Sequence, residues 1–382
     1  VLPERVNALI GFEIAPQTMC DILNRLYIKC SLEGDKLICQ IPSFRDDIEG
    51  TADIAEEVLR IYGYDNLKTE FSLNVVPRSS EPDASAYKAM IRNRLVSEGM
   101  YEAATYSFIT DKAFDMMRLP SDDPLRNAIR IKNPLGEDQS VMRTTLIHSM
   151  LNVATYNLSR KNDSGRLFEI ANIYIPHSLP LTELPDELPR LCLCVYGKDE
   201  DFYTLKGIIQ SLYEYFGLKT EFAAGGSDTF HPYRKAVIYA NKRPVGQMGE
   251  IHPETAENYA IAARVYIAEL DIKIVFNQAN LKKKLKPLPK YPAIERDMAV
   301  VMNDNQDIGP VMDTIRKAGA SLLEKVELFD IYKGSQLNED EKSAAFSLTF
   351  RAPDRTLTDD EVSNAFNEIL KALSSSYGAR LR

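Results

Sequence analysis

The first 76 residues carry short helical and strand-like patterns of apolar positions. Apolar residues recur at helical spacing over 16–27 and again over 51–62. Two strand-like runs lie between them and are joined by a turn at Gly34, and the segment 4–14 is also expected to be strand-like. The order of helix, hairpin and helix predicts a winged-helix-like small domain over residues 1–76.

A different pattern follows residues 77–86, PRSSEPDASA, which have the composition of a linker. Helices are expected at 87–95 and 147–158, and strands at 101–109, 165–175, 191–196, 236–239, 245–251 and 264–270. Strands separated by helices and hairpins predict one large, mostly antiparallel α+β domain over residues 77–281.

The run KKKLKPLPKYP at 282–292 combines lysines with prolines, so it should be extended and exposed. Beyond it, the pattern reads strand, helix, strand, strand, helix, strand. Thr358 and Glu361 form a capping box at the start of the last helix. This order predicts a ferredoxin-like βαββαβ domain over residues 282–382.

The composition, with 45% apolar and 26% charged residues, is that of a folded globular protein. The net charge of −9 means that any contact with nucleic acid should be local. No apolar run approaches the ~20 residues of a membrane span and no signal peptide is visible, so we expect a cytoplasmic protein without membrane contact. The five cysteines fit neither a disulfide framework nor a zinc site and are expected to be reduced. A start at Val1 without Met suggests a piece of a longer protein.

The clearest acidic cluster surrounds the start of the helix at 51–62. Asp53, Glu56 and Glu57 fall on one side of this helix, and Asp47 lies in the loop that enters it. Four carboxylates around one point would suit Mg²⁺, which prefers oxygen ligands. The alternative is a solvated acidic helix start, which the helix dipole also favours.

In the last domain, aromatic and guanidinium side chains lie on or beside the predicted strands: Tyr332, Arg351, Arg355 and Arg380. Such a surface suits stacking with unstacked RNA bases. Residues 290–382 nevertheless hold 12 basic against 16 acidic residues, so composition alone supports RNA binding only weakly. The lysines at 282–290 fit either a solvated linker or a contact with a nucleic-acid backbone.

Several longer blocks carry a family resemblance: PSFRDDIEGTADIAEEVLRIYGYD at 42–65, NPLGEDQSVMRTTLIHSMLNVATYNLSR at 133–160, YPAIERDMAVVM at 291–302 and AFSLTFRAPDRTLTDDEV at 345–362. Together they identify the chain as similar to the C-terminal half of the β subunits of bacterial phenylalanine-tRNA ligases. The resemblance runs over essentially the whole chain.

The resemblance implies a role for each domain. The first resembles a small domain that binds Mg²⁺, through Asp47, Asp53, Glu56 and Glu57, at the contact with a catalytic α subunit. The second resembles a class II synthetase core without its active site. The third resembles an anticodon-binding domain whose candidate base contacts are Tyr332, Ser343 and Arg380. The implied partners are the α subunit, in an α2β2 heterotetramer that binds ATP on its α chains, and tRNA(Phe).

Two features indicate that the middle domain is catalytically inactive. A class II site needs an Arg-x-Glu strand motif, whereas Arg166 is followed by Glu169 one residue out of step. The strand at 265–272 also lacks the Gly-rich motif ending in Arg that would bind the γ-phosphate. The oligonucleotide-binding and editing domains of the family have no counterpart in these residues. We therefore expect this chain neither to edit nor to aminoacylate alone.

Two other functions compete with this interpretation. A free-standing nucleic-acid-binding regulatory protein would need a basic recognition helix, whereas the helix at 51–62 is acidic. A Mg²⁺-dependent phosphotransferase would need a phosphate cradle or a cationic clamp, and beyond Arg45 and Arg60 the acidic cluster has neither.

Overall fold

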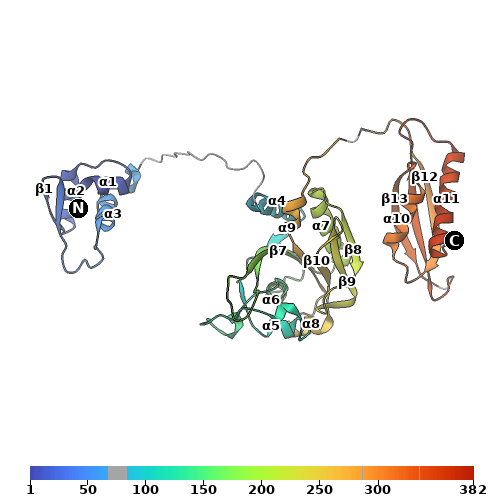
Figure 1. Cartoon of the computed structure of the whole chain (residues 1–382), viewed down its shortest axis with the longest axis horizontal. Helices are drawn as coiled ribbons and strands as arrows, with labels where there is room; N and C mark the ends of the chain where they lie inside the picture. Colours follow the sequence, from blue (N-terminus) through green and yellow to red (C-terminus); the bar gives the residue numbers. More distant parts are fainter. Residues whose placement is uncertain (68–83, 286, 335) are drawn as a thin grey trace. The chain divides into compact units, whose positions relative to one another are not determined.

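The computed structural model describes residues 1–67, 84–285, 287–334 and 336–382 (Figure 1). Contacts between residues divide the chain into two compact units, Val1–Ala86 and Tyr87–Arg382. In the part of the chain that is described, no helix is both long and apolar enough to cross a membrane. The expected linker at 77–86 lies largely outside the described residues.

The N-terminal unit is built from three helices and a hairpin. Its elements are α1 (Pro3–Ile10), α2 (Pro16–Arg25), β1 (Lys29–Glu33), β2 (Lys36–Gln40), α3 (Thr51–Tyr62) and the 3-10 turn η1 (Tyr64–Asn66). The expected order of helix, hairpin and helix is confirmed. The expected strand at 4–14 is wrong, because Val6 and Ile10 are four residues apart and pack one face of α1 into the core. Pro3 suits the first turn of that helix.

The middle of the chain forms a seven-stranded sheet in the order β3-β6-β7-β11-β10-β9-β8, with one parallel pair, β3 and β6. Its strands are β3 (Tyr101–Glu102), β6 (Gly165–Ile175), β7 (Asp186–Tyr196), β8 (Thr220–Ala224), β9 (Phe230–Ala240), β10 (Arg243–Ile251) and β11 (Val265–Asp271). The strand expected at 101–109 is interrupted, since its second part, β4 (Phe108–Ile109), pairs instead with β5 (Val141–Met142).

Helices cover both faces of this sheet (Figure 1). One face carries α4 (Ala84–Ser97), α7 (Phe202–Tyr215) and α9 (Lys273–Gln278), and the other carries α5 (Ala113–Met116), α6 (Ile147–Ser159) and α8 (Pro253–Asn258). Two 3-10 turns, η2 (Pro124–Arg126) and η3 (Glu137–Gln139), lie in the segment before α6.

Strand β7 shows why the sheet must be covered on both sides. Alternate residues point to opposite faces of a strand, so Leu193 and Val195 enter one core while Cys192 and Cys194 enter the other. All four are fully buried. An almost continuous apolar run is typical of a strand that is buried on both faces.

The C-terminal sheet confirms the predicted βαββαβ order. Its elements are β12 (Ile294–Asn303), α10 (Ile308–Ala318), β13 (Leu323–Tyr332), β14 (Glu341–Phe350), α11 (Asp359–Tyr377) and β15 (Arg380–Leu381), with strand order β13-β14-β12-β15. Both helices pack on one face of this sheet around Phe346 and Leu348. Thr358 and Glu361 form the expected capping box.

The lysine- and proline-rich run before β12 contains no helix or strand among its described residues. Leu285 and Leu288 are 93% and 89% exposed, in agreement with the expected exposure. The two boundaries between the three predicted domains remain predictions.

Candidate functional site

Asp53 lies at the start of α3 and caps the loop before it. One oxygen of its carboxylate accepts hydrogen bonds from the backbone N–H groups of Glu49, at 2.9 Å, and Gly50, at 2.7 Å. A carboxylate in this position is stabilised by the positive end of the helix dipole.

Asp47 and Glu57 are brought together by a guanidinium group. Arg45 donates to both oxygens of Asp47, at 2.9 and 2.8 Å, and its Nη2 lies 3.0 Å from Glu57 Oε1. Arg60 contacts the other oxygen of Glu57 at 2.6 Å. Glu57 is 7% exposed, and the guanidinium groups of Arg45 and Arg60 neutralise its charge.

These contacts shift the titration of both acids. The hydrogen bonds from Arg45 hold the pKa of the Asp47 carboxyl below its usual range. Burial alone would raise the pKa of Glu57, but the hydrogen bonds from Arg45 and Arg60 outweigh burial and lower it.

The four acids expected to bind Mg²⁺ therefore do not converge on one point. Glu56 is exposed, while Asp53 bonds to backbone and Asp47 and Glu57 surround Arg45. Over residues 1–67, 84–285, 287–334 and 336–382, no group of three or more acidic, cysteine or histidine side chains is arranged to hold a metal ion. The donors have the oxygen chemistry that Mg²⁺ prefers, but this arrangement does not fit the ion.

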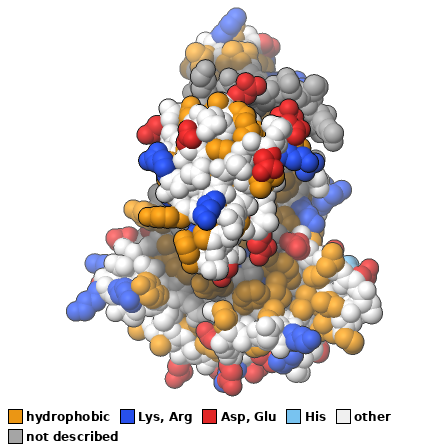
Figure 2. Space-filling model, turned by 90° about the vertical axis from the view of Figure 1, so that its left-hand side faces the viewer, with side chains coloured by type: hydrophobic (Ala, Val, Ile, Leu, Met, Phe, Trp, Pro, Cys, Tyr) orange, Lys and Arg blue, Asp and Glu red, His pale blue; other side chains and the backbone are white. Residues whose placement is uncertain are grey.

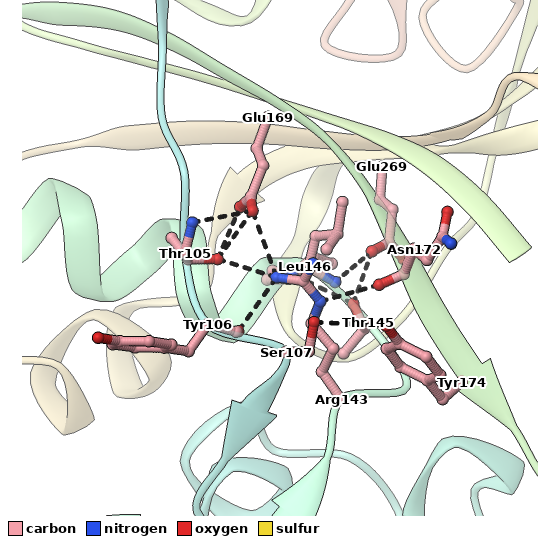
Figure 3. A network of polar contacts seen from close by, with 11 residues as sticks. Thr105, Tyr106, Ser107, Arg143, Thr145, Leu146, Glu169, Asn172, Tyr174 and Glu269 are labelled. Atoms are coloured by element: carbon pink, nitrogen blue, oxygen red, sulfur yellow. Dashed lines mark hydrogen bonds and ion pairs between the residues drawn. The ribbon is translucent and has the colours of Figure 1, made fainter. Parts of the chain in front are cut away.

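A second polar cluster lies inside the large sheet domain (Figure 3). Arg143 and Glu169 are almost fully buried, with side chains 3% and 4% exposed, and their charged groups lie 3.3 Å apart. Arg143 also donates to the Asn172 carbonyl and the Thr105 hydroxyl, both at 2.9 Å. The Thr105 backbone N–H and hydroxyl donate to Glu169, at 3.1 and 2.9 Å.

Glu269, on β11, belongs to the same cluster and bonds to residues that follow Arg143 in the chain. Its carboxylate accepts hydrogen bonds from the Thr145 hydroxyl, at 3.0 Å, and from the Leu146 backbone N–H (Figure 3). Burial raises the pKa of Glu269 in spite of these bonds. The cluster joins the segment before α6 to the sheet by polar contacts as well as by apolar packing.

The structure explains why Arg166 and Glu169 cannot form a class II clamp. They are three residues apart on β6, so their side chains lie on opposite faces of the sheet. Arg166 contacts Glu200 at 2.7 Å, whereas Glu169 is held by Thr105 and Arg143.

The three expected RNA-binding residues lie in one row across the C-terminal sheet. Tyr332 of β13 is paired with Ser343 of β14, Ser343 with Val301 of β12, and Val301 with Arg380 of β15. Directly paired residues project to the same side of a sheet. Since the neighbouring positions Val300 and Ala344 enter the core, this row lies on the face away from the helices.

Two guanidinium groups accompany this row. Arg380 makes a two-pronged ion pair with Glu341, whose pKa it lowers, and one of the two contacts measures 2.8 Å. Arg382 lies over the Tyr332 ring, 4.7 Å from its centroid, and donates to Gln336 at 2.7 Å. An aromatic ring and two planar cations thus share one end of the sheet.

Arg351 and Arg355 do not join this row. Arg351 follows the opposite end of β14 and bonds to Glu324, and Arg355 bonds to Glu361 at 2.6 Å. Of the guanidinium groups considered from the sequence, Arg380 alone among the described residues belongs to the row.

The roles of Arg45, Arg143 and Arg382 were not predicted from the sequence. Arg382 could have been found, because it is two residues from Arg380 and so shares its face. Arg143 follows two apolar residues and precedes two threonines in a largely uncharged stretch, SVMRTTLI, a pattern that could indicate a buried ion pair. The role of Arg45 depends on the path of a loop, which the sequence pattern does not specify.

Comparison with known proteins connects these sites to a family. Residues 71–272 match the family described as phenylalanyl tRNA synthetase beta chain CLM domain, residues 1–64 match the tRNA synthetase B5 domain, and residues 289–382 match the ferredoxin-fold anticodon binding domain. The chain is similar to the β subunits of phenylalanine–tRNA ligase from Clostridium tetani, with 41% identity over 379 residues, and from Clostridium acetobutylicum, with 38% over 379. The same protein from Moorella thermoacetica is 37% identical over 392 residues.

The alignments cover 99% of this chain or more, but 48% of each of these relatives. The chain thus spans about half the length of the curated relatives it matches.

Proposed function

This chain belongs to the family of phenylalanine–tRNA ligase β subunits, and from that premise we propose that it supplies the non-catalytic part of such a ligase. In this proposal it scaffolds a catalytic α subunit and binds tRNA(Phe), including its anticodon. The complex, an α2β2 heterotetramer in the cytoplasm, attaches phenylalanine to tRNA with ATP bound on the α chains.

The observation that carries the proposal is the row of Tyr332, Ser343 and Arg380 across one end of the C-terminal sheet. An unpaired base can stack on an aromatic ring while a guanidinium reads its edge or its phosphate. Ser343 is 3% exposed, so a base would reach its hydroxyl only if the side chains beside it move. A chain with a net charge of −9 repels the phosphates of RNA as a whole, so RNA must bind at a local surface. In this proposal the row is that surface.

The polar cluster of the large sheet supports a structural role for the middle domain. Arg143 forms a buried ion pair with Glu169, so its charge is neutralised inside the protein. Arg166 and Glu169, which most resemble the class II clamp, lie on opposite faces of β6. In this proposal no residue of the described sheet stabilises a triphosphate, so bond formation takes place on the α chain.

The proposed Mg²⁺ ligands remain Asp47, Asp53, Glu56 and Glu57. The ion would supply positive charge between these acids and the α subunit. Because Arg45 bonds to Asp47 and Glu57 in the structure, a metal on these two acids requires the guanidinium to leave them.

The anticodon contact is tested by measuring tRNA(Phe) affinity of the α–β complex by fluorescence anisotropy at two salt concentrations. Tyr332→Leu should weaken binding by about 5- to 100-fold, the range expected for loss of one stacked base. Arg355→Met is the matched control, since Arg355 lies outside the row and should leave the affinity unchanged.

A second measurement, on a tRNA(Phe) with a replaced anticodon, tests whether Tyr332 contacts the anticodon. If Tyr332 contacts the anticodon, Tyr332→Leu should have no further effect on a tRNA(Phe) whose anticodon has been replaced. Equal losses with both tRNAs, or no loss with either, would refute the anticodon contact.

A further inference from the structure

Three of the five cysteine side chains lie together in the N-terminal unit. The Sγ atom of Cys30 lies 3.0 Å from that of Cys20 and 3.7 Å from that of Cys39. Cys20 belongs to α2, whereas Cys30 and Cys39 belong to β1 and β2. Cys30 is therefore the middle member of a cluster of three thiols, all of which are free in the structure.

The backbone holds these thiols close to one another. Cys30 and Cys39 are directly paired across the hairpin, so their side chains project to the same side of it. The Asn24 side chain joins α2 to β1, because its Nδ2 donates to the carbonyls of Cys20 and Cys30 at 2.9 and 3.0 Å. Its oxygen accepts a hydrogen bond from the Cys30 N–H at 3.0 Å. These bonds fix the backbone of Cys30 against the helix that carries Cys20.

The two closest sulfur atoms are within reach of a covalent bond. A disulfide bond is about 2.05 Å long, so the sulfur atoms of Cys20 and Cys30 must approach by about 1 Å, which rotation of the side chains can supply. Cys39 offers Cys30 a second partner across the antiparallel hairpin, where paired Cα atoms lie about 4.5–5.5 Å apart, within the range of disulfides. Because its sulfur atoms are closer, the pair of Cys20 and Cys30 should react first.

Exposure separates this cluster from the other two cysteines. Cys30 and Cys39 are half-buried, so a small oxidant can reach them, whereas Cys192 and Cys194 are fully buried. Apolar side chains, the group that includes cysteine, reach the surface of the molecule beside charged ones (Figure 2). Burial raises the pKa of the Cys30 thiol, so little thiolate forms near pH 7 and oxidation should be slow.

We propose that Cys20, Cys30 and Cys39 form a redox-modification site at which a hydroperoxide converts Cys20 and Cys30 into a reversible disulfide. The Cys30 thiol loses its proton and attacks the peroxide, the O–O bond breaks, and a sulfenic acid and an alcohol are formed. The Cys20 sulfur then attacks the Cys30 sulfur, the S–O bond breaks, and water leaves with the Cys20 proton. Two thiols thus lose two electrons and two protons, which the peroxide accepts. This site is independent of the proposed role in tRNA charging.

The disulfide joins α2 to the hairpin. It links two residues that are 10 positions apart, and such a cross-link stabilises a folded domain by restricting its unfolded chain. Leu23 of α2, Leu37 of β2 and Val58 of α3 pack in the same core, so the bond should stabilise the whole small domain. Oxidation should increase the hydrogen-exchange protection of the most protected α2 and β2 amides by about 10- to 100-fold.

The test uses the full chain treated with hydrogen peroxide, after which free thiols are blocked. Trypsin cleaves after lysine and arginine, so Cys20, Cys30 and Cys39 lie on separate peptides, 6–25, 30–36 and 37–45. Mass spectrometry without reduction should find 6–25 joined to 30–36, and a phosphine reductant should release both. In Cys20→Ser, 30–36 should be joined to 37–45 instead.

Cys39→Ser is the matched control and should leave the bond between Cys20 and Cys30 unchanged, while Cys30→Ser should form no disulfide. Cys192 and Cys194 should remain thiols. The proposal is overturned if Cys30 stays a thiol or stops at sulfinic acid, or if the linked peptides come from two chains that migrate as a dimer on a gel. Oxidation of Cys192 and Cys194 to the same extent, or a disulfide in Cys30→Ser, would also overturn it. Where a variant fails to fold, the peptide map of the unmodified sequence decides alone.

Discussion

The buried pair of Arg143 and Glu169 gives a sharp prediction about the stability of the large sheet domain. Arg143→Met leaves the Glu169 carboxylate, 3% exposed, without its cation. Breaking a buried pair by removing one partner typically costs about 3–5 kcal/mol, because the remaining charge cannot be hydrated. The hydroxyl and N–H of Thr105 still donate to Glu169, so we expect a loss near 3 kcal/mol, at the lower end of ~3–5 kcal/mol.

Native-state hydrogen exchange of the β6 and β7 amides measures this loss within the domain concerned. Arg130→Met is the matched control, because Arg130 pairs with Asp111 at the surface with a side chain that is 69% exposed. It should cost less than about 1 kcal/mol.

The double variant Arg143→Met/Glu169→Leu separates charge from packing. Replacing both partners by apolar residues removes the stranded charge, so at least half of the lost protection should return. A loss in Arg143→Met no greater than that in Arg130→Met, or a double variant no more stable than the single one, would refute a stabilising buried pair.

Three further predictions concern stability. Thr358→Ala should lower the free energy of unfolding of the C-terminal domain by about 1 kcal/mol, measured by urea unfolding, because it removes a helix cap; a cost near zero would contradict the capping role. Gly246→Ala should cost at least about 1–3 kcal/mol by the same assay, since a Cβ at this position would lie 2.1 Å from the Glu269 carbonyl oxygen; wild-type stability would show that the strands can separate there. The raised pKa of Glu269 makes the folded state bind the proton more tightly, so its stabilising contribution is present at low pH and is lost as pH rises through the folded pKa. Glu269→Gln should therefore gain stability relative to wild type as the pH rises above the ordinary pKa of glutamate, measured in thermal unfolding scans, and a difference independent of pH would contradict this.

The C-terminal domain was predictable because its local signals agree with one another. The first helix of the expected order is α10, and the capping box at Thr358 marks the start of α11. Its strands show a clear alternation of apolar and polar residues and follow one another closely along the chain, so the order of the elements could be predicted from the sequence.

One error comes from a position where a distant contact decides the structure, and another from a segment whose apolar spacing is helical rather than strand-like. The strand expected at 101–109 is broken where Thr105 bonds to Glu169, 64 residues away. At the N-terminus, the apolar residues Val6 and Ile10 fit a helix once Pro3 begins it.

In the candidate sites, too, the residue types could be predicted from the sequence but their contacts could not. Their residue types could be selected from the sequence, but the row formed by Tyr332, Ser343 and Arg380 depends on strand register, which pattern alone does not give. The pairing of Arg45 with Asp47 and Glu57 depends on a loop, and it places two of the four predicted ligands in an ion-paired cluster.

Phenylalanine-dependent exchange of pyrophosphate into ATP tests the division of labour between this chain and an α subunit most directly. Measured on the 382-residue chain alone, on the α chain and on their purified complex, it reports formation of the activated amino acid. We expect no exchange from the chain alone and exchange from the complex that is unaffected by Arg166→Met. Exchange by this chain without an α subunit would contradict the account.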